Sequence, residues 1–221
     1  MKGITASQIV DWTRLNDPKK NMQYYTRLCG HKQYSSTMVK GFEVRHNYNP
    51  EGKSHEFYVL DKEHFKVLYY CALTPSGERS IFKPNLHPYY EKLIWRARRG
   101  LVPNFAQHVF FKCIMPECKS FICSDEQQTI EGYWHWMRLI CKALDLYYTV
   151  VLFAVDNKND RRYIYLDEYD EDIMTADVRD FLTGDDLKFR HRGIMISVKN
   201  DIINSSVKAK EYTDIYEFLE D

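Results

Sequence analysis

The clearest pattern of hydrophobic and polar positions lies between residues 121 and 166, and it predicts a strand end, a polar loop, a long helix and two strands. In residues 129–146 the polar side chains recur at spacings of three and four positions, the period of an α-helix. Most other residues there are apolar, so we expect this helix to be buried on most sides, with one narrow solvent-facing edge. The uncharged run TVVLFAV at 149–155 predicts a strand covered on both faces. Residues 156–160 predict a turn, and residues 161–166 a neighbouring strand.

Residues 1–30 predict a helical hairpin. The first helix covers residues 5–15, and the second begins at Asp17 and Pro18 and ends at Gly30. A short polar side chain such as that of Asp17 caps a helix N-terminus, and proline fits the first helical position. The face expected to be buried carries Met22, Tyr25 and Leu28.

Turn signals divide the rest of the chain into further elements. Alternating patterns predict strands at residues 42–48, 55–60, 65–73, 108–115, 119–123 and 194–199. Helices are predicted at residues 85–99, 175–182 and 213–219, and residues 30–41 are expected to form a loop. The whole predicts an α+β fold in a single domain, 1–221, with a mixed, mostly antiparallel sheet, a buried central helix and further helices on its faces.

Composition is that of a globular protein with a sizeable core, since 44% of the residues are hydrophobic and 28% are charged. The 31 basic residues balance the 31 acidic residues, so no global field would draw the chain to nucleic acid or to an anionic membrane. Only nine residues are glycine, which counts against a glycine-rich phosphate cradle.

The N-terminal sequence MKGITASQIVDW has no apolar core of the length that a signal peptide needs, and no long uncharged apolar run follows it. We therefore expect a soluble, cytoplasmic protein that does not enter a membrane. The six cysteines are then expected to be reduced thiols. Secretion by a route that uses no cleavable signal stays open as the alternative.

Three cysteines, Cys113, Cys118 and Cys123, are candidates for metal ligands, and they are flanked by His108 and His135. Their five-residue spacing is longer than the usual zinc knuckle, although Pro116 provides a turn between the first two. The alternative is that Cys113 and Cys123 are small apolar strand residues, and this is the interpretation we adopt. We therefore expect no bound metal and no cofactor.

The polar loop at residues 124–129 is the candidate catalytic site. It joins a strand end to a helix N-terminus, which is where open α/β sheets place ligands. Asp125 and Glu126 are candidates for a general base. The alternative is that this loop only caps the helix.

The order strand, loop, helix, strand, preceded by an antiparallel hairpin, resembles the middle of the N-acetyltransferase (GNAT) fold. That family binds the pyrophosphate of coenzyme A with the motif Q/R-x-x-G-x-G/A. Residues 128–133 of this chain, QTIEGY, contain one glycine, in a shifted position, and Glu131 would face the phosphates. The similarity is therefore one of element order, and it implies only an acyltransferase-like arrangement.

Two charged clusters are candidate contact surfaces. One is basic and aromatic and comprises Trp95, Arg96, Arg98 and Arg99, near the end of the helix predicted at 85–99. Arginines beside aromatic rings are used to bind single-stranded nucleic acid, although the helix dipole alone would also explain basic residues there. The other is the acidic run at 167–172, which includes Asp170 and Glu171 and suits either a solvated loop or a basic partner.

No motif in the sequence names a reaction. The first hypothesis is therefore an intracellular accessory, effector or inhibitor protein that acts by binding another protein, because aromatic residues are abundant and make good interface anchors. The alternatives are a small transferase-like enzyme with its site at 124–129, and a protein that binds RNA or single-stranded DNA.

Overall fold

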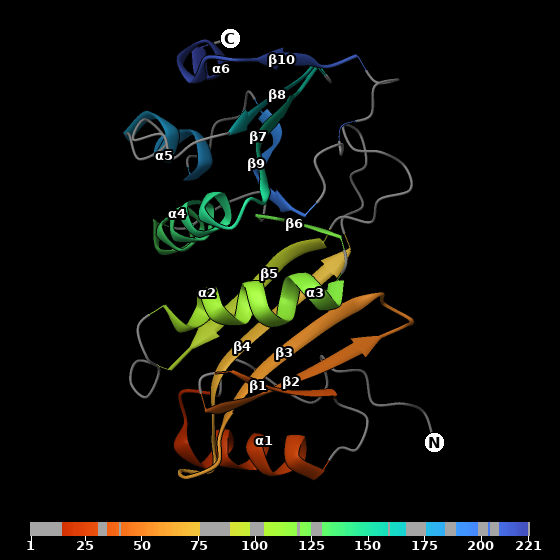
Figure 1. Cartoon of the computed structure of the whole chain (residues 1–221), viewed down its shortest axis with the longest axis vertical. Coiled ribbons are helices and arrows are strands. Elements are labelled where there is room, and N and C mark those ends of the chain that lie inside the picture. Colours follow the sequence, from red (N-terminus) through yellow and green to blue (C-terminus); the bar gives the residue numbers. More distant parts are fainter. Residues whose placement is uncertain are drawn as a thin grey trace. The chain divides into compact units, whose positions relative to one another are not determined.

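The computed structural model describes residues 15–30, 35–39, 41–75, 89–97, 104–118, 120–124, 130–158, 160–166, 176–183, 189–198, 203 and 208–220. Helices and mostly antiparallel strands give an α+β fold, as the sequence predicts (Figure 1). The chain divides into two compact units: unit 1 comprises Met1–Pro75 and Glu91–Lys119, and unit 2 comprises Ser76–Tyr90 and Ser120–Asp221. That residues 1–221 fold as a single domain stays a prediction.

Unit 1 is built on strands in the order β1, β2, β3 and β4, followed by residues 91–96 of β5. The first four pair antiparallel along the chain. The predicted strands at 42–48, 55–60 and 65–73 are confirmed, whereas the loop expected at 30–41 contains β1. The strand bounds are β1 Ser35–Val39, β2 Phe42–Asn49, β3 Ser54–Asp61, β4 Lys66–Pro75 and β5 Tyr89–Arg96.

Helix α1, Pro18–Gly30, packs on one face of this sheet. Asp17 caps it as predicted, because its Oδ1 accepts hydrogen bonds from the backbone N–H groups of Lys19 and Lys20 at 2.9 and 3.3 Å. Tyr25 and Leu28 are buried as expected, but Met22 is 51% exposed. The first helix of the predicted hairpin, 5–15, lies almost entirely outside the described residues.

The segment predicted as a strand at 108–115 is helical, and that prediction was wrong. It forms α2 Phe105–Val109, the π-helical turn η3 Phe110–Ile114 and α3 Met115–Cys118. In η3 the N–H of Met115 bonds to the carbonyl of Phe110, five residues back. This wider turn comes directly before Pro116, whose ring would otherwise crowd the carbonyl four residues earlier. The helical segment packs through Phe105, whose ring meets that of Phe42 edge to face at 5.1 Å.

Unit 2 has strands in the order β6, β9, β7, β8 and β10, and residues Tyr89 and Tyr90 of β5 pair parallel with β6. Strand β9 pairs antiparallel with both β6 and β7, and β7 with β8, while β10 runs parallel to β8. Strands β6 to β9 confirm the predictions at 119–123, 149–155, 161–166 and 194–199. The bounds are β6 Phe121–Cys123, β7 Thr149–Asp156, β8 Arg161–Leu166, β9 Phe189–Ser197 and β10 Lys210–Tyr212.

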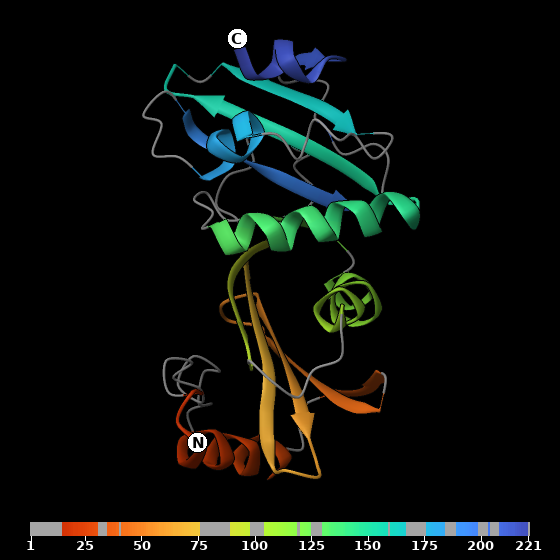
Figure 2. The same ribbon diagram turned by 90° about the vertical axis from the view of Figure 1, so that its left-hand side faces the viewer.

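Helices α4, Ile130–Asp145, and α5, Ala176–Thr183, lie along one face of this sheet, as Figures 1 and 2 both show. The predicted central helix is confirmed, but its exposed edge is broader than expected, because Ile130 and Trp134 are exposed, Trp134 by 39%. Helix α6, Ile215–Glu220, confirms the helix predicted at 213–219, follows an Asp214 cap and buries Ile215 and Phe218. No helix in the described part of the chain is long and apolar enough to cross a membrane.

Gly193 fixes how closely β9 approaches the end of β6. Ser124, fully buried, donates its N–H to the carbonyl of Ile194 at 2.8 Å, and its Oγ accepts the N–H of Ile194 at 3.0 Å. A Cβ at Gly193 would lie 2.7 Å from Ser124 Oγ and 3.3 Å from the Phe153 ring. The hydroxyl cannot turn away without breaking its bond to Ile194, so a larger residue must displace backbone.

Gly193→Ala should therefore lower the free energy of unfolding by about 2 kcal/mol, measured by urea denaturation. The loss should shrink in a Ser124→Ala background, where the closest contact is removed, although that background itself loses the bond to Ile194. Gly30→Ala is the matched control, since a Cβ there meets nothing within 4 Å. Equal losses from Gly193→Ala in both backgrounds would contradict this explanation.

Candidate functional site

The structure describes only part of the sites predicted from the sequence. The candidate catalytic pair and both contact clusters fall largely in segments that it does not describe, so these predictions stay predictions. The residues outside the described part are Asp125, Glu126, Arg98, Arg99, Asp170 and Glu171.

Trp95 and Arg96 are described, and they lie on a strand. The helix predicted at 85–99 was wrong: residues 89–96 form β5, and the N–H of Ala97 bonds to the carbonyl of Leu68 on β4 at 2.8 Å. Neighbouring strand residues point to opposite faces, so Trp95 and Arg96 do not form one surface. Arg96 is exposed, whereas Trp95 is half-buried against the core under α1.

Trp95 lines a groove of about 590 Å³ between α1, the β3–β4 turn and the end of β5, all within unit 1. Its indole Nε1 donates to Asn16 Oδ1 at 3.3 Å. The walls are mainly apolar, and the ionisable side chains among the lining residues are two lysines and a histidine. The lining residues are Leu15, Asn16, Pro18, Lys19, Asn21, Met22, His64, Phe65, Lys66, Val67, Trp95 and Ala97.

Two large apolar side chains at this groove are turned to solvent: Met22 and Phe65, the latter 57% exposed. Phe65 ends the β3–β4 turn with φ +51°, in the left-handed region that favours glycine or asparagine. Among the ring pairs described, its ring meets that of Tyr25 in a T-shaped arrangement, with the centroids 5.8 Å apart. Phenylalanine is an unusual residue for this backbone conformation, and more than half of its side chain stays exposed beside the groove.

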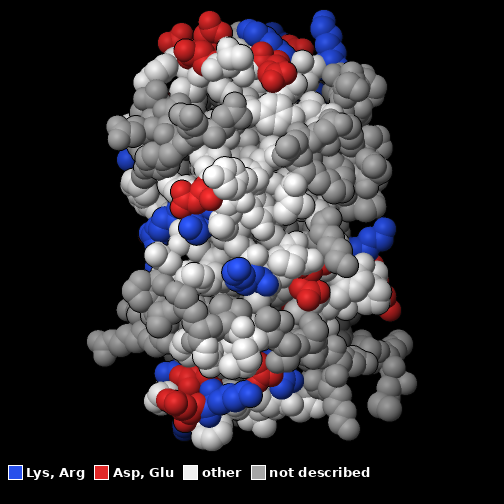
Figure 3. Space-filling model, in the orientation of Figure 1, with Lys and Arg blue, Asp and Glu red and all other residues white. Residues whose placement is uncertain are grey.

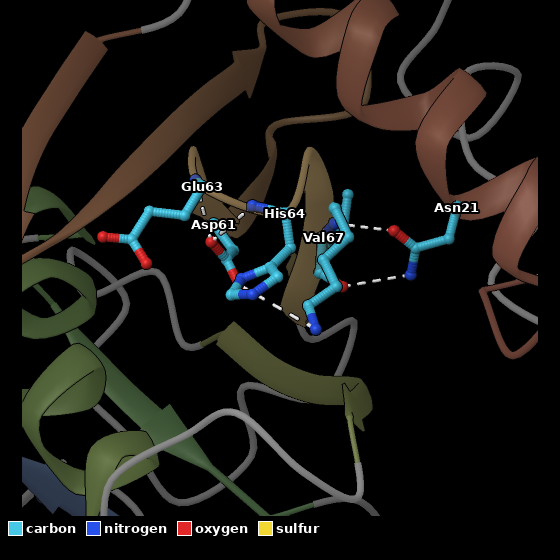
Figure 4. A network of polar contacts seen from close by, with 6 residues as sticks. Asn21, Asp61, Glu63, His64 and Val67 are labelled. Atoms are coloured by element: carbon cyan, nitrogen blue, oxygen red, sulfur yellow. Dashed lines mark hydrogen bonds and ion pairs between the residues drawn. The ribbon is translucent and has the colours of Figure 1, made fainter.

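Asn21 forms one wall of the groove and fastens α1 to β4 (Figure 4). Its Oδ1 accepts the N–H of Val67 at 2.7 Å, and its Nδ2 donates to the carbonyls of Val67 and Leu15 at 3.0 and 2.9 Å. The side chain is buried, and it satisfies three backbone groups that would otherwise lack these partners. The groove wall is therefore held rigidly.

Asp61 shapes the turn that carries Phe65. Its Oδ1 accepts the N–H groups of Glu63 and His64 at 3.0 and 3.1 Å, and its Oδ2 lies 2.9 Å from His64 Nδ1 (Figure 4). Burial alone would raise the pKa of this carboxyl, but the bonds from His64 and Glu63 and the charge of His64 outweigh it, and the pKa is lowered. The carboxylate therefore stays ionised and keeps the turn closed.

Positive and negative side chains are mixed on the described surface, so the charge at the groove depends on individual residues. In Figure 3, Lys and Arg side chains lie among Asp and Glu side chains, and neither sign alone covers the described surface on that face. Lys62 is paired with Glu43 at 3.0 Å, and Lys66 lies 3.9 Å from Asp61. Exposed Lys19 has no ion pair among the described residues. Asp61 thus faces both His64 and Lys66, and Lys19 is the cation of the lining without an ion pair among the described residues.

The candidate thiols do not form a metal site in the described residues, where no three His, Cys, Asp or Glu side chains lie close enough together to hold an ion. Cys113 and Cys118 lie on the helical segment and Cys123 on β6. Burial and the nearby charge of Glu117 raise the pKa of the Cys113 thiol to about 11 and raise that of Cys118, while burial raises that of Cys123. Thiols with raised pKa values are poor nucleophiles and poor ligands.

A histidine pair lies on the opposite face of the unit 1 sheet from α1. His46 Nε2 and His55 Nδ1 are 2.9 Å apart, and the rings stack with centroids 5.1 Å apart. Glu117 Oε2 lies 3.5 Å from His46 Nδ1, and Phe57 stacks on His46 at 4.5 Å. Burial, together with the positive charge that His46 would carry, lowers the pKa of His55 to about 4, and burial lowers that of His46 against the opposing charge of Glu117. Both rings are therefore neutral near pH 7.

Arg192, which the sequence places next to further basic residues, is buried in unit 2. Arg192 and Arg162 occupy the register positions on either side of Ala154. The guanidinium of Arg162 lies 5.0 Å from the centre of the Phe218 ring, and that of Arg192 lies 5.5 Å from Phe181. Such cation–π contacts hold α5 and α6 on the sheet.

The sequence predicts Trp95 as a contact residue, which stays a prediction, and it gives no signal for the exposure of Phe65 and Met22 at the same groove. No protein-family model matches the sequence, and no curated protein matches it.

Proposed function

We propose that the protein acts by binding another protein, and that the groove lined by Trp95 and Phe65 receives a short segment of that partner. The exposed Phe65 in a left-handed conformation is the observation that carries this proposal. Aromatic side chains at the centre of an apolar depression are the residues that dominate protein interfaces. A rigid wall, held by Asn21, reduces the entropy lost on binding.

The charge of the lining selects the class of partner. Lys19, His64 and Lys66 stand around apolar walls, and no acidic side chain is among the lining residues described. An apolar or aromatic anchor flanked by Asp or Glu would place its ring against Trp95 and its carboxylates beside the lysines. The proposed partner segment is therefore an acidic peptide with one large apolar anchor.

Selection from a random library of displayed peptides, about twelve residues long, tests this proposal. The enriched peptides should carry a large apolar residue beside acidic residues. Phe65→Gly removes the ring and relieves the backbone conformation, so it should weaken binding of these peptides by about tenfold or more without lowering the melting temperature.

The matched control is Tyr147→Gly, which makes the same kind of change at an exposed turn of unit 2. It should leave the affinity for the selected peptides unchanged. Failure to enrich any peptide, or equal affinity of the wild type and Phe65→Gly, would contradict the proposal.

A further inference from the structure

The end of α4 has a regular helix-terminating motif with an unusual residue in its key position. The N–H of Tyr148 bonds to the carbonyl of Ala143 at 2.9 Å, and the N–H of Tyr147 bonds to the carbonyl of Leu144 at 3.0 Å. This pair of bonds defines a Schellman motif, in which the residue at the Tyr147 position adopts a left-handed conformation. Tyr147 has φ +59°, and glycine is the residue normally found there.

Burial of the Tyr147 side chain does not offset this unfavourable backbone conformation, because the side chain is 96% exposed. The neighbouring Leu146 is also exposed. A helix end selected for stability alone would carry glycine or asparagine at this position. A fully exposed ring kept there indicates a contact with another molecule.

The ring stands beside a depression of about 430 Å³ in unit 2. Three tyrosines contribute to its lining, and none of the described lining residues is charged. The lining residues are Leu144, Tyr147, Tyr148, Thr149, Val150, Tyr165 and Leu166. The depression therefore offers aromatic rings and the hydroxyl of exposed Tyr147 to an uncharged ligand.

We propose that this depression binds a proline-rich segment of another protein in the polyproline II conformation. Such a segment has no internal hydrogen bonds, so one of its carbonyls can accept a bond from the hydroxyl of exposed Tyr147. Its proline rings pack on aromatic faces, and little conformational entropy is lost because the helix is preformed. A sugar is favoured less, because the lining has no carboxylate or amide side chain to bind paired hydroxyls.

Titration of the full-length protein with a peptide of about ten prolines, followed by nuclear magnetic resonance, tests the proposal. The wild type should bind this peptide and should not bind a Gly-Ser peptide of equal length. Tyr147→Gly should bind it about tenfold or more weakly while its melting temperature rises by about 2–4 °C, since the left-handed residue no longer carries a Cβ. Tyr147→Phe, which keeps the ring, should retain part of the affinity.

Phe65→Gly serves as the control, because it alters the groove of unit 1 and should bind the proline peptide as the wild type does. Absence of proline-peptide binding to the wild type, or equal binding by Tyr147→Gly, would overturn the proposal. Binding of a soluble hexose oligomer, lost in Tyr147→Gly, would overturn it in favour of a carbohydrate site. A lower melting temperature in Tyr147→Gly would also overturn it, because the ring would then serve the fold.

Discussion

Replacing Asn21 with leucine should lower the free energy of unfolding by about 3 kcal/mol or more, although the two side chains have similar volumes. The substitution leaves the N–H of Val67 and the carbonyls of Val67 and Leu15 buried without the partners that Asn21 supplies. Each buried polar group left unsatisfied costs about 1–3 kcal/mol. Relaxation of the helix and access of water offset part of this sum, so the loss should be smaller than three full penalties. Urea denaturation followed by circular dichroism measures it.

Asn49→Ala is the matched control for this experiment. Asn49 Oδ1 also accepts two backbone N–H groups, from Glu51 and Gly52 at 3.1 and 3.4 Å, but the turn is exposed and water replaces the lost bonds. Its substitution should cost about 1 kcal/mol or less. Similar losses in both variants would show that the bonds to Val67 and Leu15 contribute no more than a surface turn does.

Asn21→Leu also tests whether binding of the acidic peptide depends on the rigid wall of the groove or on the exposed ring of Phe65. Asn21→Leu removes the bonds between α1 and β4, whereas Phe65→Gly leaves them in place. If the groove binds the acidic peptide through its shape, Asn21→Leu should weaken binding under conditions where the protein is still folded. Binding that depends on Phe65 but not on Asn21 would assign the affinity to the exposed ring rather than to the rigid wall.

The elements that the sequence predicted correctly are those whose signals are local. Residues 149–155 are uncharged and rich in β-branched side chains, and β7 is buried along almost its whole length. The adjacent residues Asp17 and Pro18 are enough to predict where α1 begins. Asn49 and Asp61 close turns by bonds to residues two and three positions ahead, so their meaning can be read without the fold.

The errors occurred where tertiary contacts override local preference. In residues 85–99, Leu93, Ile94 and Ala97 have helical spacing, yet the segment pairs as β5 with strands distant in the sequence. The apolar and aromatic run at residues 108–115 resembles a strand, but a π-helical turn brings successive apolar side chains, among them Phe110 and Phe111, to the buried side. Neither pairing partners nor a π-helical turn has a signature in a single sequence.

The residues of the candidate groove also differ in how far the sequence alone predicts them. Trp95 was predicted as a contact residue from composition, and it lines the groove for a different reason from the one given, since it lies on a strand and not at a helix end. Phe65 could not be identified, because its distinguishing features are its exposure and its left-handed backbone. Asparagine is common in loops and helix ends, so the role of Asn21 appears only when Val67 is placed beside it.

Acidification should destabilise unit 1 through the pair formed by His46 and His55. The pKa of His55 is about 4 in the folded protein and 6.5 in an unfolded chain, so the unfolded state binds more protons between these values. The stabilisation is complete above pH 6.5, is lost as the pH falls from 6.5 toward about 4, and does not change further below that. Each pK unit corresponds to about 1.4 kcal/mol, which gives a loss of roughly 3 kcal/mol from His55. Urea denaturation at a series of pH values measures this loss.

His55→Phe isolates this effect, because phenylalanine keeps the ring stack with His46 and Phe57 but cannot take up a proton. Glu56 acts in the opposite direction, since burial raises its pKa, against the hydrogen bonds from Tyr70, Tyr58 and Asn47. Its contribution favours folding at low pH and is lost as the pH rises through its folded pKa. That contribution is common to both proteins, so the difference between the two pH profiles reports His55 and its interaction with His46. The variant should lose less stability than the wild type between pH 6.5 and about 4. Parallel profiles would mean that His55 is protonated as readily in the folded protein as in the unfolded chain.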